Sequence, residues 1–196
     1  ATISTIFGLL IAIAFVRFSD FGGRLFLSLF ASAPLVMPEA VTGLSMLLLF
    51  IAMEASFGWP SGRGVDTIMI AHATFGMCFA AVVIQTRLRN MDKTLEEAAR
   101  DLGGRQPFVF LSITFPLILP SVIAAWLLSF TLSFDDVVIA SFVSGPGSST
   151  LPIVIFSKIR LGVSPEINAI ATLMILAISV LVMIGGFMVL RRDRKK

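Results

Sequence analysis

The sequence predicts an all-α integral membrane protein. Its 196 residues are 57% hydrophobic and only 14% charged, which is more apolar surface than a soluble domain needs. The apolar residues gather into runs that approach the about 20 residues a helix needs to cross a bilayer. Charged residues, glycine and proline fall between these runs, where a membrane protein has its loops. Composition and spacing therefore favour a bundle of membrane helices and exclude a soluble enzyme or nucleic-acid-binding domain.

Five apolar runs are predicted to span the membrane, within a single transmembrane domain that covers residues 1–196. The predicted spans are Thr2–Val16, Pro38–Met53, Thr67–Ile84, Leu117–Phe134 and Ile167–Leu190. The first run is short for a span, and the chain begins with Ala and lacks the charged start of a signal peptide. We therefore expect a fragment whose N-terminal part, with a sixth span, is missing.

The segments between the runs carry turn-forming residues. Pro34 and Pro38 cannot both lie in one undisturbed helix, so the chain up to about Pro38 is expected to be an interfacial lead-in. Residues 54–66 are rich in Gly and Pro and predict a loop. Residues 144–150 predict a turn, and residues 151–162 an amphipathic helix at the membrane interface.

The basic residues predict the orientation. If residues 87–116 face the cytoplasm, twelve of the fifteen Lys and Arg residues lie on that side, including the C-terminal run RRDRKK. The other three are Arg63, Lys158 and Arg160. The positive-inside rule then places this segment and the C-terminus in the cytoplasm. Topology therefore explains the net charge of +3 without a nucleic-acid partner.

Residues 94–116 are the longest charged interruption of the apolar sequence. Thr94 and Glu97 have the spacing of a capping box, which predicts a helix that starts at Thr94. Gly103 and Gly104 are expected to stop that helix, because glycine is favoured just past a helix end. Pro107 can open the next helix in its first turn. The pattern predicts a short solvated helix, a stop and a second helix.

Several ionisable or polar residues fall where membrane depth makes them costly, by roughly 2.5 to 3.5 kcal/mol for a charge at the bilayer centre. Asp135 and Asp136 end a span as a pair, which either caps the span at the outer interface or lines a path for a cationic solute. Only one of the two is expected to face such a path. Trp126 packs at a helix contact or lines the path, and Glu39 is either interfacial or part of it.

No catalytic or metal site is predicted. The sequence has no Gly-rich phosphate loop, and its one cysteine, Cys78, allows no internal disulfide or cysteine cluster. His72 is expected to be packed or hydrogen-bonded. Because His72 and the acidic residues are predicted to be scattered over both sides of the membrane, no Ser/His/Asp set is expected. If transport is active, another subunit must hydrolyse the ATP.

One pattern is similar to a known family signature. It consists of Glu97, Ala98 and Ala99, then Gly103 after three residues, then Ile113–Pro116 after nine more. This resembles the EAA signature of ABC-importer permeases, with phenylalanine in place of its leucine. The resemblance implies the transmembrane domain of a type I importer, with six spans in its usual core. It also implies that residues 87–116 are a cytoplasmic coupling loop, whose helix docks into a groove of an ATPase through Glu97, Ala98, Ala99 and Gly103.

A second resemblance covers nearly all of the chain from Pro34 onward. The segments Met37–Phe50, Gly58–Gly64, Ala71–Phe75, Ser133–Ser157 and Arg160–Leu173 look like the polyamine branch of these permeases. This implies a permease for putrescine or spermidine in a bacterial inner membrane. Its implied partners are a second permease, two ATPase subunits that hold ATP and Mg, and a periplasmic polyamine-binding protein.

Other functions stay open at this point. The same architecture serves iron, thiosulfate and phosphonates. An ATP-independent transporter or channel would need coupling-ion residues within its spans, which are nearly free of ionisable groups. A structural membrane subunit would have no solute path. The spacing of the EAA pattern argues against the last two classes.

Overall fold

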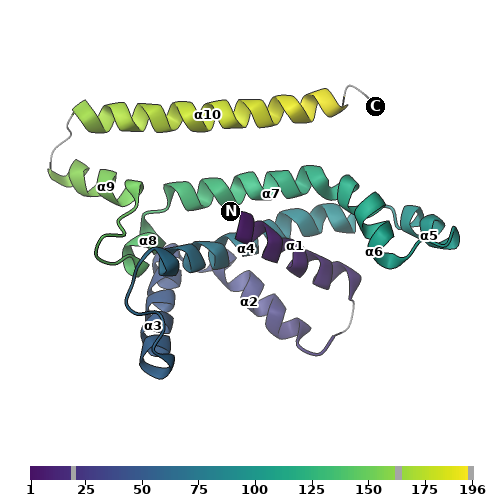
Figure 1. Ribbon diagram of the computed structural model, residues 1–196, viewed down its shortest axis with the longest axis horizontal. Helices are drawn as coiled ribbons and strands as arrows, with labels where there is room; N and C mark the ends of the chain where they lie inside the picture. The colour runs from purple at the N-terminus through teal and green to yellow at the C-terminus, as the bar shows by residue number, and fades with distance from the viewer. Residues whose placement is uncertain (19–20, 162–164, 194–196) are drawn as a thin grey trace. The chain divides into compact units, whose positions relative to one another are not determined.

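The computed structural model describes residues 1–18, 21–161 and 165–193, and every element assigned in these ranges is a helix (Figure 1). This confirms the predicted all-α class. The chain divides into two compact units, residues 1–149 and residues 150–196. The first unit contains α1 to α8 and a π-helical segment, η1, and the second contains α9 and α10.

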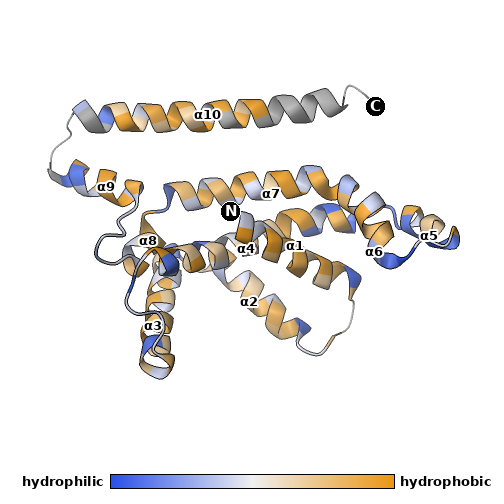
Figure 2. Ribbon diagram, in the orientation of Figure 1, coloured by the Kyte–Doolittle hydropathy of each residue, from blue (hydrophilic) through white to orange (hydrophobic). Residues whose placement is uncertain are grey.

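The elements of the first unit follow the predicted order of apolar runs. They are α1 (Thr2–Arg17), α2 (Arg24–Val36), α3 (Glu39–Phe57), α4 (Val65–Arg89), α5 (Thr94–Asp101), α6 (Gln106–Val109), η1 (Phe110–Thr114), α7 (Phe115–Asp135) and α8 (Val138–Val143). Figure 2 shows that hydrophilic residues gather at α5 and near helix ends, while α3 and α7 are largely apolar. Their distribution therefore matches that of loops between membrane helices.

Helix α4 lies at the centre of the first unit. It packs against α1 and α7, and it also contacts α2, α3 and α8. Its most apolar stretch is 44% buried, against 17% for α3 and 22% for residues 106–135. Small residues allow the closest contact, since a Cβ on Gly8 of α1 would lie 2.6 Å from the Cβ of Ala80 in α4. Helix α4 is therefore the scaffold that positions the other helices of this unit.

Two apolar clusters form the core of the first unit. The first joins α1, α4 and α7 through Ala12, Ala80, Ile84, Leu88, Ile118 and Ala125. The second joins α3, α4 and α8 through Phe50, Ile68, Ala71, Phe75, Ile139 and Val143. Cys78 is buried in α4, as expected for a small packing residue.

Within the part of the chain that the structure describes, three helices are long and apolar enough to cross a membrane: Glu39–Phe57, Val65–Arg89 and the continuous helix Gln106–Asp135. They correspond to three of the five predicted spans. The first predicted span is the shorter helix α1, and the last contains the apolar stretch Asn168–Ile184. All five predicted spans are therefore helical, and three of them lie in helices that are long enough to cross a membrane.

Several predicted boundaries were wrong. The second helix expected to open at Pro107 and the span expected to start at Leu117 form one continuous helix, Gln106–Asp135, with the π-helical segment Phe110–Thr114 between them. The loop predicted over 54–66 is shorter, since α3 continues to Phe57 and α4 begins at Val65. The break at Pro38 is confirmed, because that residue is the N-cap of α3.

The second unit consists of α9 (Leu151–Leu161) and α10 (Pro165–Asp193). The turn predicted before α9 is confirmed, and in α9 the guanidinium carbon of Arg160 lies 4.7 Å from the ring centre of Phe156. An interfacial position for α9 stays a prediction. The end of the predicted basic tail, residues 194–196, lies outside the described residues.

Candidate functional site

The short helix α5 begins where predicted but is capped differently. Thr94 is its first residue, and the predicted capping box between Thr94 and Glu97 was wrong, since α5 has no side-chain bond from its N-cap residue, Lys93. Instead, the backbone N–H of Thr94 donates to Oδ1 of Asp92 over 3.0 Å, a local pattern that Asp favours at turns. This hydrogen bond lowers the pKa of Asp92 from its ordinary value.

The end of α5 is fixed by two glycines, as predicted. The N–H of Gly104 donates to the carbonyl of Ala99 over 3.0 Å, and the N–H of Gly103 donates to the carbonyl of Arg100 over 2.8 Å. This pair of bonds is a Schellman motif. Gly103 has φ +85°, and a Cβ on Gly104 would lie 2.7 Å from the carbonyl oxygen of Ala99. The stop therefore depends on glycine at both positions.

The predicted coupling residues lie on the accessible side of α5. Glu97, Ala98 and Gly103 are exposed, and Ala99 is half-buried. Leu102, next to Gly103, is 90% exposed although it is apolar. The small alanine side chains make this surface nearly flat, and the exposed leucine projects from it. Such a surface can fit a groove on another protein.

The opposite side of α5 holds a residue that sequence reasoning missed. Glu96 is only 5% exposed, and its Oε1 accepts hydrogen bonds from the guanidinium of Arg17 and from the hydroxyl of Thr114. The first is also an ion pair. Arg17 ends α1 and Thr114 ends η1, so one carboxylate joins three elements. The sequence shows only that Glu96 adjoins Glu97, and no local pattern indicates the partners of Glu96.

The π-helical segment η1, Phe110–Thr114, overlaps the start of the predicted Ile113–Pro116 part of the signature. The N–H of Phe115 donates to the carbonyl of Phe110, five residues earlier. Pro116 has no N–H and cannot make the ordinary helical bond to residue 112. The wider π turn keeps the helix continuous at this point, and such turns are frequent at functional sites.

A cavity of about 620 Å³ lies where α1, α5, α6 and η1 meet. Its walls combine apolar and charged side chains, which include Ile13, Arg17, Lys93, Glu96, Arg100 and Phe110. The cavity therefore borders the hydrogen bonds of Glu96.

The two acidic residues at the far end of α7 have different environments. Asp135 is exposed, whereas the side chain of Asp136 is only 8% exposed. The carboxylate of Asp136 caps α8, since it accepts hydrogen bonds from the N–H groups of Ile139 (3.1 Å) and Ala140 (2.7 Å). This agrees with the expectation that the two side chains do not face the same way.

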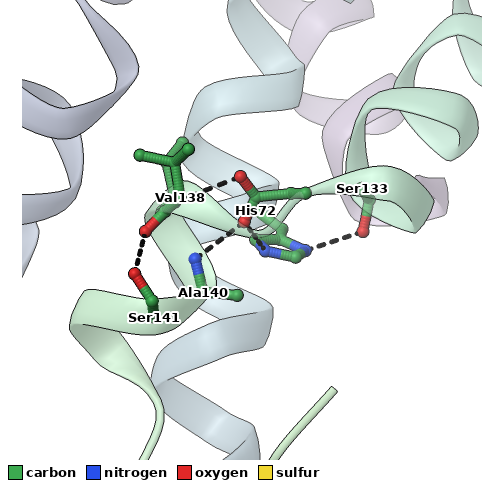
Figure 3. Close-up of polar contacts among 7 residues, drawn as sticks. His72, Ser133, Val138, Ala140 and Ser141 are labelled. Carbon is green, nitrogen blue, oxygen red and sulfur yellow. Dashed lines mark hydrogen bonds and ion pairs between the residues drawn. The ribbon is translucent and has the colours of Figure 1, made fainter. Parts of the chain in front are cut away.

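His72 links α4 to this end of α7 (Figure 3). Its Nε2 lies 2.9 Å from Oδ2 of Asp136, and its Nδ1 lies 2.8 Å from the hydroxyl of Ser133. Because an ionised carboxylate only accepts hydrogen bonds, Nε2 of His72 donates to Oδ2 of Asp136. The expectation that His72 is hydrogen-bonded is confirmed.

The prediction that no Ser, His and Asp come together was wrong. His72, Ser133 and Asp136 are in direct contact, because the packing of α4 against α7 brings residues together that are about sixty positions apart. The adjoining cavity is only about 10 Å³, which is roughly the space of one water molecule. A substrate has no room there, so we interpret the cluster as a polar link between helices.

Trp126 lies on α7 and begins a row of aromatic rings. Its Nε1 donates to the hydroxyl of Thr2 over 3.1 Å, so the side chain packs at a contact with α1. The ring of Trp126 stacks on Phe130 with centroids 5.4 Å apart, and Phe130 stacks on Phe134 at 5.5 Å. The row leads along α7 towards Asp135, and the rings of Phe130 and Phe134 are half-buried.

Glu39 is not part of this group. It is the exposed first residue of α3, and its place in a solute path stays a prediction.

Comparison with known proteins identifies the family. Residues 4–196 match the model of the binding-protein-dependent transport system inner membrane component. The chain belongs to this family. It is 50% identical, over its whole length and 70% of the relative's, to the putrescine transport system permease protein PotI of Escherichia coli (strain K12).

Two further relatives have related names. The spermidine/putrescine transport system permease protein PotC of Escherichia coli (strain K12) is 39% identical over the whole chain and 71% of its own length. The protein of the same name from Haemophilus influenzae is 41% identical over 94% of this chain and 69% of its own length. The family and the apolar helices together show a multi-pass membrane protein that is a permease component.

Proposed function

We propose that the chain is a membrane-spanning permease subunit of an ATP-driven polyamine importer. The observation that carries this is the 50% identity over all 196 residues to a permease named for putrescine transport. The exposed surface of α5, with Glu97, Ala98 and Gly103, supports it, because an importer of this kind needs a surface that receives force from an ATPase.

The proposed assembly has four kinds of subunit. This chain forms the translocation path with a second permease, and α5 docks on a cytoplasmic pair of ATPase subunits that bind ATP and Mg. A periplasmic binding protein delivers the polyamine. The proposed location is the bacterial inner membrane, with residues 87–116 and the C-terminus in the cytoplasm, since twelve of fifteen basic residues then lie inside.

Within this assembly, Asp135 is the acidic residue that we assign to the solute path. It is exposed at the end of α7, whereas Asp136 is occupied by His72 and by the backbone of α8. The stacked rings of Phe130 and Phe134 lead towards Asp135. Aromatic faces attract amine cations by about 0.5 to 2 kcal/mol, which is weak enough to let a solute move on.

The proposed mechanism is alternating access. Closure of the ATPase dimer moves α5, and the continuous helix from Gln106 to Asp135 carries that movement to the end that bears the acidic pair. A dication released by the binding protein then pairs transiently with the carboxylate of Asp135 and passes into the cell.

The test is uptake of labelled putrescine into liposomes that hold the complete complex, with and without ATP. Competition by spermidine, ferric iron and thiosulfate identifies the solute class. ATP-dependent uptake that only polyamines block supports the proposal. ATP-driven uptake of another solute would keep the importer and reject the polyamine, and uptake without ATP would favour a secondary transporter.

The role of Asp135 is tested in the same liposomes. Asp135→Asn is expected to lower putrescine uptake by about tenfold, since it removes a charge that the dication meets. Asp66→Asn is the matched control, because Asp66 is also exposed at a helix end but lies in the first turn of α4. Equal uptake by the two variants would reject Asp135 as a path residue.

A further inference from the structure

The carboxylate of Glu96 is buried, although burying a charge does not by itself stabilise a fold. Glu96 carries a formal charge although only 5% of its surface is exposed. Removing a carboxylate from water is costly, and a buried ion pair is often no more stabilising than apolar residues of the same size. Packing alone therefore does not explain why a charged residue occupies this position.

The partners of Glu96 indicate what it connects. A single oxygen, Oε1, accepts from Arg17 at the end of α1 and from Thr114 at the end of η1. Glu96 itself lies in α5, so a displacement of α5 pulls on both bonds at once. The neighbouring Glu97 is exposed and lines the same cavity as Glu96.

Thr114 belongs to the part of the long helix that is easiest to deform. The π segment Phe110–Thr114 already departs from the ordinary helical bond pattern, and Pro116 removes another backbone donor just beyond it. The cavity of about 620 Å³ beside Glu96 leaves space for side chains to shift. A pull on Thr114 therefore acts where the helix Gln106–Asp135 can change its pitch.

We propose that Glu96 is the positioning residue that transmits the movement of α5 to the long helix, through Thr114 of the π segment, with Arg17 of α1 as the fixed point. The role of α5 as the moving part rests on the function proposed above. Glu97 contacts the ATPase from the exposed side, and Glu96 passes the displacement inward.

The first experiment compares two substitutions of Thr114 in the assembled importer in liposomes. Thr114→Val keeps the size of the side chain and removes the hydroxyl that donates to Glu96. Thr114→Ser keeps the hydroxyl. Thr114→Val is expected to lower putrescine uptake per ATP hydrolysed by about tenfold, within the usual range of coupling between sites, while basal ATP hydrolysis stays unchanged. Thr114→Ser is expected to match the wild type. Unchanged uptake per ATP in Thr114→Val would overturn the proposal, and so would an equal loss in both variants.

The second experiment exchanges the ion pair. Glu96→Arg alone places two cations together and is expected to abolish coupling, whereas the double variant Arg17→Glu with Glu96→Arg is expected to recover part of it. A double variant that assembles but recovers no coupling would overturn the role of Arg17 as the fixed point.

A third measurement separates this proposal from the proposed function. Spin labels at Leu95 of α5 and Leu111 of η1, which are 47% and 65% exposed, report the distance between these two elements in the same complex. Thr114→Val is expected to broaden that distance distribution. If the wild-type complex fails to transport putrescine but the broadening occurs, the function is wrong and the link through Glu96 stands. If transport is ATP-driven and no broadening occurs, the link is wrong.

Discussion

The hydroxyl oxygen of Thr67, in the first turn of α4, lies 2.7 Å from the carbonyl oxygen of Val143, the last residue of α8. The same hydroxyl accepts from the N–H of Gly64 over 2.9 Å, and the side chain is completely buried. One hydroxyl thus satisfies a backbone donor at the start of α4 and a carbonyl at the end of α8. The short helix α8, which follows the acidic pair, is thereby tied to the central helix.

Thr67→Val is expected to destabilise the protein by about 1 to 3 kcal/mol, because it leaves buried backbone groups without partners while the volume stays the same. Thr67→Ser keeps the hydroxyl and is therefore expected to lose much less stability. Thermal unfolding of the purified protein in detergent measures both. Equal midpoints for Thr67→Val and the wild type would contradict the prediction.

The contact between α1 and α4 makes a second prediction. A Cβ on Gly8 would meet the Cβ of Ala80 at 2.6 Å and the backbone nitrogen of Ala81 at 2.9 Å. Gly8→Val is therefore expected to cost about 1 to 3 kcal/mol through overpacking. Gly22→Val is the control, since no other atom lies within 4 Å of a Cβ there. Similar thermal stability of the two variants would show that α1 does not pack closely on α4.

A third prediction separates the two acidic residues at the end of α7. Asp136→Ala removes a helix cap, which costs about 0.5 to 2 kcal/mol, and also leaves His72 without its carboxylate partner. Asp135→Ala is expected to leave stability unchanged, because that side chain is exposed. Denaturation of the two variants in parallel checks this. A larger loss of stability for Asp135→Ala than for Asp136→Ala would contradict the structural role assigned to Asp136.

Much of the fold was predictable because membrane helices leave strong local signals. The break at Pro38, the helix over α4 and the stop at Gly103 follow from apolar run length and from the backbone limits of proline and glycine. These signals fail where the backbone adapts. A span was expected to start at Leu117, but the π segment before it joins that span to a longer helix.

The candidate site was less predictable because its main contacts join distant residues. Glu96 meets Arg17 from 79 positions away, and His72 meets Asp136 from 64 positions away. No periodic pattern contains this information, so Glu96 looked like an ordinary exposed acid and His72 was not expected to meet Ser133 and Asp136. The exposed side of α5 was predictable because its residues follow a local spacing.

The stop of α5 makes the last prediction. Gly103 has φ +85°, and a residue with a Cβ is strained there by about 1 to 2 kcal/mol. Gly103→Ala is therefore expected to shift the end of α5 and to lower uptake per ATP hydrolysed, while the solute-loaded binding protein still binds. Gly103→Asn is the matched control, since asparagine tolerates the left-handed conformation better than alanine. Both variants are measured for uptake, ATP hydrolysis and binding in liposomes. If Gly103→Asn loses as much coupling as Gly103→Ala, the side chain itself blocks the docking surface, and the conformation of the stop is not the cause.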